Sequence, residues 1–214
     1  MPTRAAIAGA IVLLALAAPT ANPAVRAQVD SALSATDRAR LARGETVARP
    51  VEERRGPFRL MGGTSFQVID LPPEAVWQAL NDHPSRLRHM LPQVRRARQV
   101  ESQGAVRVLR FEHHVGVVEA SYALRFEYYP SQKTLLFRLD DARDNDLRAA
   151  WGYLRLRPWG DGTQTLVSFG AMVDIGDGLI TGVVRPTVHE WVLKIPLTLK
   201  WYVEGRGRQR YARL

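Results

Sequence analysis

The sequence predicts an α+β protein in which an antiparallel sheet is followed by a long C-terminal helix. Between residues 117 and 129, apolar and polar side chains alternate strictly, as in a strand with one buried and one solvated face. From Val188 to Tyr202, apolar residues recur every three or four positions, which is typical of an amphipathic helix. The chain has 214 residues, of which 46% are hydrophobic and 24% charged, so we expect one globular domain with an appendage.

The N-terminus has the features of a secretory signal. A positive region ending at Arg4 precedes an uncharged apolar stretch, residues 5–18, and Ala27 completes a small-x-Ala cleavage motif. We therefore interpret residues 1–27 as a signal peptide cleaved after Ala27, which predicts a periplasmic or secreted protein. The apolar stretch is shorter than the roughly 20 residues of a spanning helix. An uncleaved N-terminal membrane anchor is the alternative.

Residues 28–57 form a polar, arginine-rich arm. Ser34 or Thr36 suits the N-cap of a short helix that Gly44 would end. Residues 45–51 could extend as a short strand. The compact domain is predicted to occupy residues 58–212.

Within that domain, the predicted order is one strand, two short helices, six antiparallel strands and the long helix, giving about seven strands in all. The first strand is 65–70, and Pro73 sits in the first turn of the helix that follows, where its missing N–H costs nothing. Pro196 lies inside the last helix and should kink it, because proline removes a backbone hydrogen bond. The remaining segments are a helix at 84–90 and strands at 94–101, 105–114, 117–129, 134–139, 147–157 and 163–174.

Several kinds of chemistry are excluded by residues that the chain lacks. It has no cysteine, so it has no disulfide, thiolate nucleophile, iron–sulfur cluster or cysteine zinc site. It also lacks a Gly-x-Ser-x-Gly elbow, a phosphate loop, a dinucleotide fingerprint and a His-Glu-x-x-His motif. The acidic stretch 140–146 lacks the glycine and final glutamate of a calcium loop, which indicates a solvated loop. We expect no cofactor and no metal.

The charge is strongly positive. The net charge is +9, and the basic residues comprise 27 arginines and 3 lysines, with clusters at 95–98 and 206–213. A basic chain suggests nucleic acid, but an exported protein rarely meets any, so we expect no nucleic-acid partner. Solvated faces are the simplest interpretation of both clusters. An anionic membrane surface is the partner that such arginines would otherwise suit.

Residues 66–82 resemble the opening of the SRPBCC superfamily, which includes START lipid-transfer domains, birch-pollen-allergen-like proteins and polyketide cyclases. The resemblance rests on Pro73, Val76, Trp77 and Asp82 after the first strand, and it extends over about residues 58–210. It implies a helix-grip fold, a curved antiparallel sheet wrapped around the C-terminal helix. The space between sheet and helix is usually a pocket for an apolar ligand.

The predicted binding site lies between one face of the sheet and the apolar stripe of the last helix. Apolar side chains would surround the ligand, and a few polar groups would orient it. The candidate ligand-binding residues are Leu109, Phe111, His113, Tyr122, Leu124, Phe126, Leu135, Phe137, Trp151, Val188, Trp191, Val192 and Ile195.

Three functions fit these observations. The favoured one is an exported carrier or scavenger of a lipid or other hydrophobic small molecule. The first alternative is a polyketide cyclase or dehydratase-like enzyme using the same cavity, for which His113 and Tyr122 are the weak catalytic candidates. No acid–base pair in the sequence matches such enzymes, which favours binding over catalysis and leaves the enzyme alternative open. The second alternative is an envelope module that binds anionic surfaces without a ligand.

Overall fold

The computed structural model describes residues 33–91, 93–115, 118–176 and 184–211; the predicted signal peptide lies outside them. The compact unit that begins at Ser34 contains a sheet of eight strands and several short helices. The strands are β1 (Val47–Arg55), β2 (Phe58–Ile69), β3 (Val94–Gln103), β4 (Val106–Val115), β5 (Val118–Tyr129), β6 (Thr134–Leu139), β7 (Ala149–Trp159) and β8 (Gln164–Asp174). The helices are α2 (Ala35–Ala42), α3 (Pro73–Asn81), α4 (Leu87–Met90), α5 (Val184–Leu193), α6 (Ile195–Glu204) and α7 (Arg208–Tyr211), with 3₁₀ turns at Pro84–Arg86 and Pro130–Gln132.

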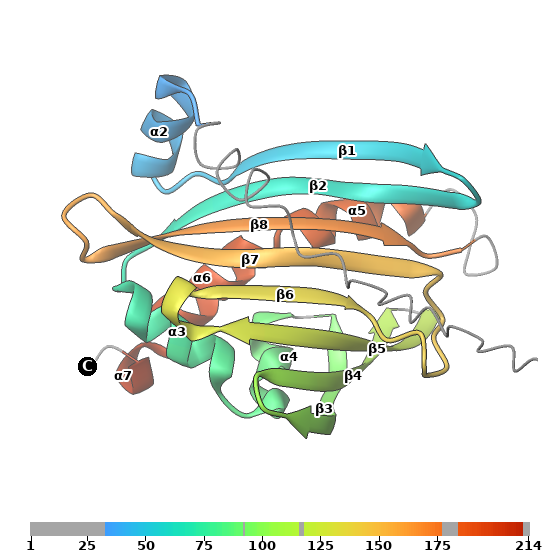
Figure 1. Ribbon diagram of the computed structural model, residues 1–214. Coiled ribbons are helices and arrows are strands. Elements are labelled where there is room, and N and C mark those ends of the chain that lie inside the picture. Colours follow the sequence, from blue (N-terminus) through green and yellow to red (C-terminus); the bar gives the residue numbers. More distant parts are fainter. Residues whose placement is uncertain (1–32, 92, 116–117, 177–183, 212–214) are drawn as a thin grey trace, which may run out of the picture. The chain divides into compact units, whose positions relative to one another are not determined.

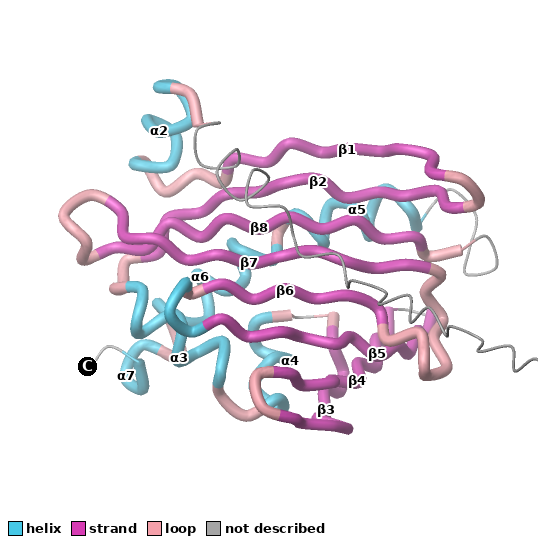
Figure 2. Tube along the Cα trace, viewed as in Figure 1, coloured by secondary structure: helices cyan, strands magenta, loops and turns pink. Residues whose placement is uncertain are grey.

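The sheet is antiparallel throughout and has the strand order β1-β2-β8-β7-β6-β5-β4-β3 (Figure 1). The sheet is curved. Because β1 and β3 are its two edge strands, it does not close on itself. Figure 2 shows the helices lying along the sheet rather than between its strands. The predicted α+β helix-grip class is confirmed. None of the helices within the described ranges is long and apolar enough to cross a bilayer.

The eighth strand comes from the N-terminal arm. The segment for which the sequence indicates a short extended stretch is longer in the structure, and β1 pairs with β2 from Val47 to Arg55. The two strands form a hairpin through Gly56, so β1 completes the backbone hydrogen bonds of β2 on the side away from β8. The arm is therefore an integral edge of the sheet.

Helix α2 begins at the cap that the sequence proposes. The Ser34 hydroxyl accepts a hydrogen bond from the Asp37 N–H, and the Asp37 carboxylate accepts one from the Ser34 N–H, a reciprocal capping box. This arrangement selects Ser34 over Thr36 as the N-cap. Gly44 follows the helix with φ +82°, a left-handed conformation that glycine adopts without strain.

The long C-terminal helix is divided in two at the predicted kink. Helix α5 ends at Leu193, and α6 starts at Ile195, with Pro196 in its first turn. Proline has no N–H to donate to the preceding turn, so the ladder cannot continue unbroken through it. Helix α5 lies mainly against β1, β2 and β8, and α6 against β2, β8 and α4.

The core lies on the face of the sheet that these helices cover. Side chains from the strands pack there against α3, α4 and α6, and fully buried members include Val76, Phe111, Val167 and Leu199. A second, smaller cluster lies next to α5 and consists of Met61, Leu139, Ala150, Val173 and Ile175. The helices therefore bury two neighbouring parts of one sheet face.

The acidic loop 140–146 is docked on β5 rather than free in solvent as its composition indicates. The Asn145 side-chain oxygen accepts from the Ala123 N–H (2.7 Å), and the Asp146 carboxylate accepts from the Ser121 N–H (2.7 Å). Arg143 bridges Asp140 in the loop to Glu101 on β3. Because β6 ends at Leu139, these groups pair the backbone donors of β5 that lie beyond the last residue of β6.

Candidate functional site

The strand register defines which side chains face the helices. Leu109 lies opposite Leu124, and Phe111 lies opposite Tyr122, on neighbouring strands. Directly paired residues of antiparallel strands point to the same side of the sheet. These residues therefore share the face that we call the inner face. Phe137 on β6 is on it too, because it pairs with Phe126.

The candidate lining residues differ in burial. Leu109, Phe111, Phe126 and Leu135 are buried members of the main core cluster, so they support the site from beneath. The others on the inner face or on α5 and α6 are only half-buried, and all of them except His113 and Trp191 pack against a core cluster. These half-buried residues are His113, Tyr122, Leu124, Phe137, Val188, Trp191, Val192 and Ile195.

Trp151 lies on the other face of the sheet. It pairs with Arg138 on β6 and Met172 on β8, one position out of phase with the inner-face residues. Gly152 is the inner-face residue of this part of β7, and a Cβ added to it would overlap the ring of Phe137. Because strand side chains alternate, Trp151 cannot share the predicted site. Its selection as a lining residue was wrong.

The half-buried set lies where the helices leave the sheet least covered. Helices α5 and α6 pack chiefly on the β1, β2 and β8 side, whereas α4 packs on β3 at the opposite edge. Strands β4, β5 and β6 lie between these two groups (Figure 1). Tyr122, Leu124 and Val192 contact both hydrophobic clusters and thus mark the seam between them. Solvent reaches apolar side chains along this seam.

His113 and Tyr122 form a polar pair at one end of the seam. The His113 Nε2 atom and the Tyr122 hydroxyl share a hydrogen bond of 2.7 Å, and the two rings stack with centroids 5.3 Å apart. Burial lowers the pKa of His113 to about 4 and raises the pKa of Tyr122 above its usual value. Both side chains are therefore uncharged at neutral pH.

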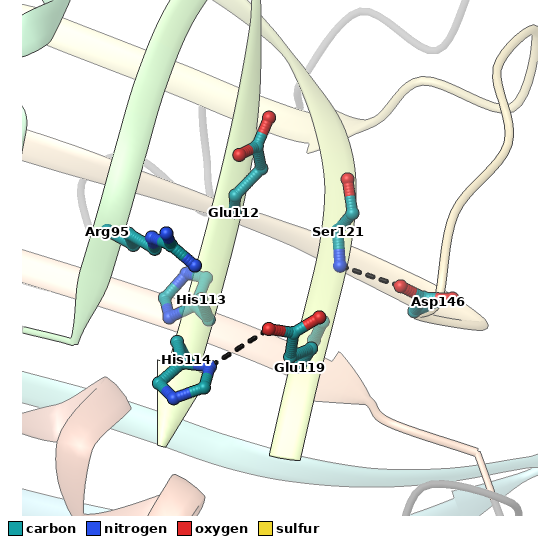
Figure 3. A pocket seen from close by; sticks show the side chains of 8 residues that line it. Arg95, Glu112, His113, His114, Glu119, Ser121 and Asp146 are labelled. Atoms are coloured by element: carbon teal, nitrogen blue, oxygen red, sulfur yellow. Dashed lines mark hydrogen bonds and ion pairs between the residues drawn. The ribbon is translucent and has the colours of Figure 1, made fainter. Parts of the chain in front are cut away.

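Next to this pair is a polar hollow of about 280 Å³ (Figure 3). His113 and Ala120 belong to the inner face, whereas the residues of β4 and β5 beside them in sequence belong to the opposite face. Arg95 on edge strand β3 and Asp146 in the loop after β6 complete the lining. Its lining residues are Arg95, Glu112, His113, His114, Glu119, Ala120, Ser121 and Asp146. His114 and Glu119 contact each other at 3.0 Å. The hollow therefore lies mainly on the outer face of β4 and β5, next to His113 and Ala120 of the inner face.

Two residues with defined roles at different places on the sheet were not identified from the sequence. Arg95 belongs to the 95–98 cluster, but a β-bulge between Val94 and Arg96 displaces it from the ladder, and its side chain extends toward His113 (Figure 3). His189 fixes α5 to the sheet, with Nε2 2.6 Å from the Gly62 carbonyl and Nδ1 3.3 Å from the Glu52 carboxylate. Bulges and long-range contacts of this kind leave no periodic signal in a sequence.

The functional groups at the site are few and uncharged near neutral pH. Within the described ranges, no three histidine or acidic side chains are arranged to hold a metal ion. The polar groups nearest the apolar seam are a neutral imidazole and a neutral phenol, which can donate or accept hydrogen bonds to a ligand.

The buried His113 predicts a defined pH dependence of stability. An unfolded histidine takes up a proton below a pKa of about 6.5, whereas folded His113 stays neutral until about pH 4. The stability that depends on its neutral form is complete above pH 6.5 and is lost as the pH falls toward 4. Between pH 6.5 and 4, the free energy of unfolding of His113→Phe should fall by about 2 kcal/mol less than that of the wild-type protein. Urea unfolding at several pH values in this range measures the difference.

The exposed neighbour on the other face supplies the control. His114→Phe makes the same substitution on the exposed side of β4, so it reports what exchanging an imidazole for a phenyl ring does to stability at pH 7. If His113→Phe and the wild-type protein lose stability in parallel between pH 6.5 and 4, the burial of a neutral His113 is disproved.

Comparison with known proteins identifies the fold. No family model and no curated protein matches the chain. Among solved structures, the Zhui aromatase/cyclase of a Streptomyces species matches with a TM-score of 0.57 and 15% identity, over 77% of this chain and 96% of that chain. The STAR-related lipid transfer protein from Xanthomonas axonopodis matches with a TM-score of 0.57 and 12% identity, over 73% and 98% of the two chains.

A third solved structure agrees with these two. A START superfamily protein from Mycobacterium smegmatis matches with a TM-score of 0.52 and 15% identity, over 69% of this chain and 97% of that chain. At such identities the likeness concerns the fold. The chain therefore has the helix-grip fold shared by START proteins and polyketide aromatase/cyclases, as the resemblance of residues 58–210 to the SRPBCC superfamily implies.

Proposed function

We propose that this protein is an exported binding protein for an elongated hydrophobic molecule, a lipid or lipid-like compound. The observation that carries the proposal is the row of half-buried apolar side chains along the seam, including Leu124, Phe137, Val188 and Val192. Each methylene group of a ligand that leaves water there would contribute about 0.8 kcal/mol. The fold supports the proposal, since two neighbours are named for START proteins or lipid transfer.

The polar end of the ligand would lie at the His113–Tyr122 pair. Both groups are uncharged near neutral pH, so they suit a hydroxyl, carbonyl or ester better than a bare charge. The adjacent hollow carries Glu112, Glu119 and Asp146 as well as Arg95, so it does not favour a strongly anionic head group. The proposed ligand is therefore a neutral amphiphile.

Binding is favoured over a cyclase-type reaction by the protonation properties of the same pair. A general acid or base works best with a pKa near the operating pH. Burial moves the pKa of His113 down and that of Tyr122 up, away from neutrality in both cases. His113 and Tyr122 therefore each keep one protonation state near neutral pH, which suits hydrogen bonds that orient a ligand.

The test is mass spectrometry of the organic extract of the full-length protein after expression in a heterologous host and purification from the cell envelope. We expect an apolar compound in near-equimolar amount. We also expect the intact mass of a chain that begins at Gln28. A protein that carries no such compound and also fails to take up apolar fluorescent probes would exclude the proposed function.

A further inference from the structure

One aromatic side chain on α6 is exposed against the usual preference of its residue type. Pro196, Leu199, Tyr202 and Val203 face the interior, and Trp201 lies on the opposite side of the helix with 63% of its surface exposed. Tryptophan has a large apolar body and one N–H, and it is enriched where apolar and aqueous phases meet. A single exposed apolar side chain is ordinary by itself, so the case for a contact surface depends on the charges around Trp201.

Three arginines near Trp201 have no acidic partner among the residues that the structure describes. Arg206 and Arg208 follow the end of α6, and Arg88 lies on α4, which packs against α6. All three are exposed, and none has an ion pair with any of the described residues. In contrast, the neighbouring Lys200 is paired with Glu204.

Two further acidic side chains lie at this end. Asp70 is exposed, and its N–H donates to the Glu204 carboxylate in the last turn of α6. The other, Asp82, is already satisfied. Asp82 accepts from Arg210 (2.8 Å), Arg86 (3.1 Å) and the Tyr211 hydroxyl (2.7 Å). It therefore does not neutralise the three free arginines.

His89 places two of these arginines near the last turn of α6, which carries Trp201. Its ring stacks on Tyr202, the residue next to Trp201, with centroids 5.7 Å apart. Partial burial, and then the charges of Arg88 and Arg206, lower the pKa of His89. The connection after α6 also folds back, since the Gly205 N–H donates to the Trp201 carbonyl. Trp201 and the arginines thus occupy one end of the molecule, formed by α4, α6 and α7 (Figure 1).

We propose that Trp201, Arg88, Arg206 and Arg208 form a docking surface for a bilayer that contains anionic phospholipid. The indole would lie at the level of the head groups, and the three unpaired guanidinium groups would contact lipid phosphates. A lipid surface fits better than an acidic protein, because separate positive charges beside one exposed indole suit head groups that can rearrange around them. The docking surface is separate from the seam, so it does not depend on which ligand the protein carries.

The test measures binding of the full chain to vesicles of phosphatidylglycerol and phosphatidylcholine, and to vesicles of phosphatidylcholine alone. We expect a preference for the anionic vesicles that weakens as salt is added. Replacement of two arginines in Arg206→Glu/Arg208→Glu should weaken binding to the anionic vesicles by at least about tenfold. Any contribution of the apolar N-terminal segment is common to all variants and cancels.

The control variant has the same change in net charge at another place. Arg38→Glu/Arg54→Glu alters two exposed arginines on α2 and β1 and should bind nearly as the wild-type protein does. Brominated phosphatidylcholine mixed into the anionic vesicles should quench wild-type tryptophan fluorescence, and Trp201→Phe should lose most of that quenching. Equal weakening by both double variants, or equal quenching in Trp201→Phe, would overturn the proposed surface.

Discussion

Gly62→Ala is expected to destabilise the protein by about 3 kcal/mol or more. Gly62 has φ +154°, a conformation that other residues adopt only with strain, and an added Cβ would overlap the Ala171 carbonyl oxygen on β8. The obstacle is backbone within the sheet, so no side chain can move aside. The Gly62 carbonyl also accepts the hydrogen bond from His189 that holds α5. Thermal unfolding should show a decrease in Tm of about 6–12 °C.

A second glycine distinguishes the cost of backbone strain from the cost of steric overlap of the added Cβ. Gly104, in the β3–β4 hairpin, also has a positive φ of +58°, but an added Cβ there would meet no atom within 4 Å. Gly104→Ala should therefore cost only about 1 kcal/mol. Similar losses in the two variants would show that close approach of β8 to β2 is not what requires glycine at position 62.

The largest expected effect on binding is that of Leu124→Asn. Leu124 is half-buried on the inner face and contacts both hydrophobic clusters, so it would touch a ligand in the seam. Replacing its isobutyl group with a carboxamide removes apolar contact and leaves a polar group to be desolvated. We expect apolar-probe affinity to fall by about 2 kcal/mol, roughly thirtyfold, in a fluorescence titration with phenylnaphthylamine.

Leu136 provides the matched control on the other face. It is also a half-buried leucine, one strand away on β6, but it pairs with Glu127 and Tyr153 on the outer side of the sheet. Leu136→Asn should leave probe affinity unchanged at a comparable cost in stability. If both variants bind the probe equally well, the ligand does not lie on the inner face.

Local features of the fold could be predicted because they depend on neighbouring residues. The Ser34 cap, the helix that starts at Pro73 and the break at Pro196 each follow from the conformational limits of a few residues. The alternation along β5 likewise placed Tyr122, Leu124 and Phe126 on one face, as the structure confirms through their pairing partners.

Features that depend on register or on distant partners could not be predicted. The face of Trp151 is set by its pairing with Arg138 and Met172, and a shift of one residue reverses the face. The composition of loop 140–146 indicates solvation, yet Asn145 and Asp146 replace the missing partner strand of β5. The bulge at Arg95 depends in the same way on how β3 meets β4.

By itself, the sequence determined the class of fold, the order of its elements and the apolar face that could hold a ligand, because backbone limits and side-chain periodicity act over a few residues. Only the tertiary structure decided which side chains on that face stay half-buried and joined His113 to Tyr122. It also left Trp201 exposed, and three arginines without an ion pair among the described residues. Those outcomes depend on packing between segments far apart in the chain, where contact is set by the whole fold rather than by neighbours in sequence.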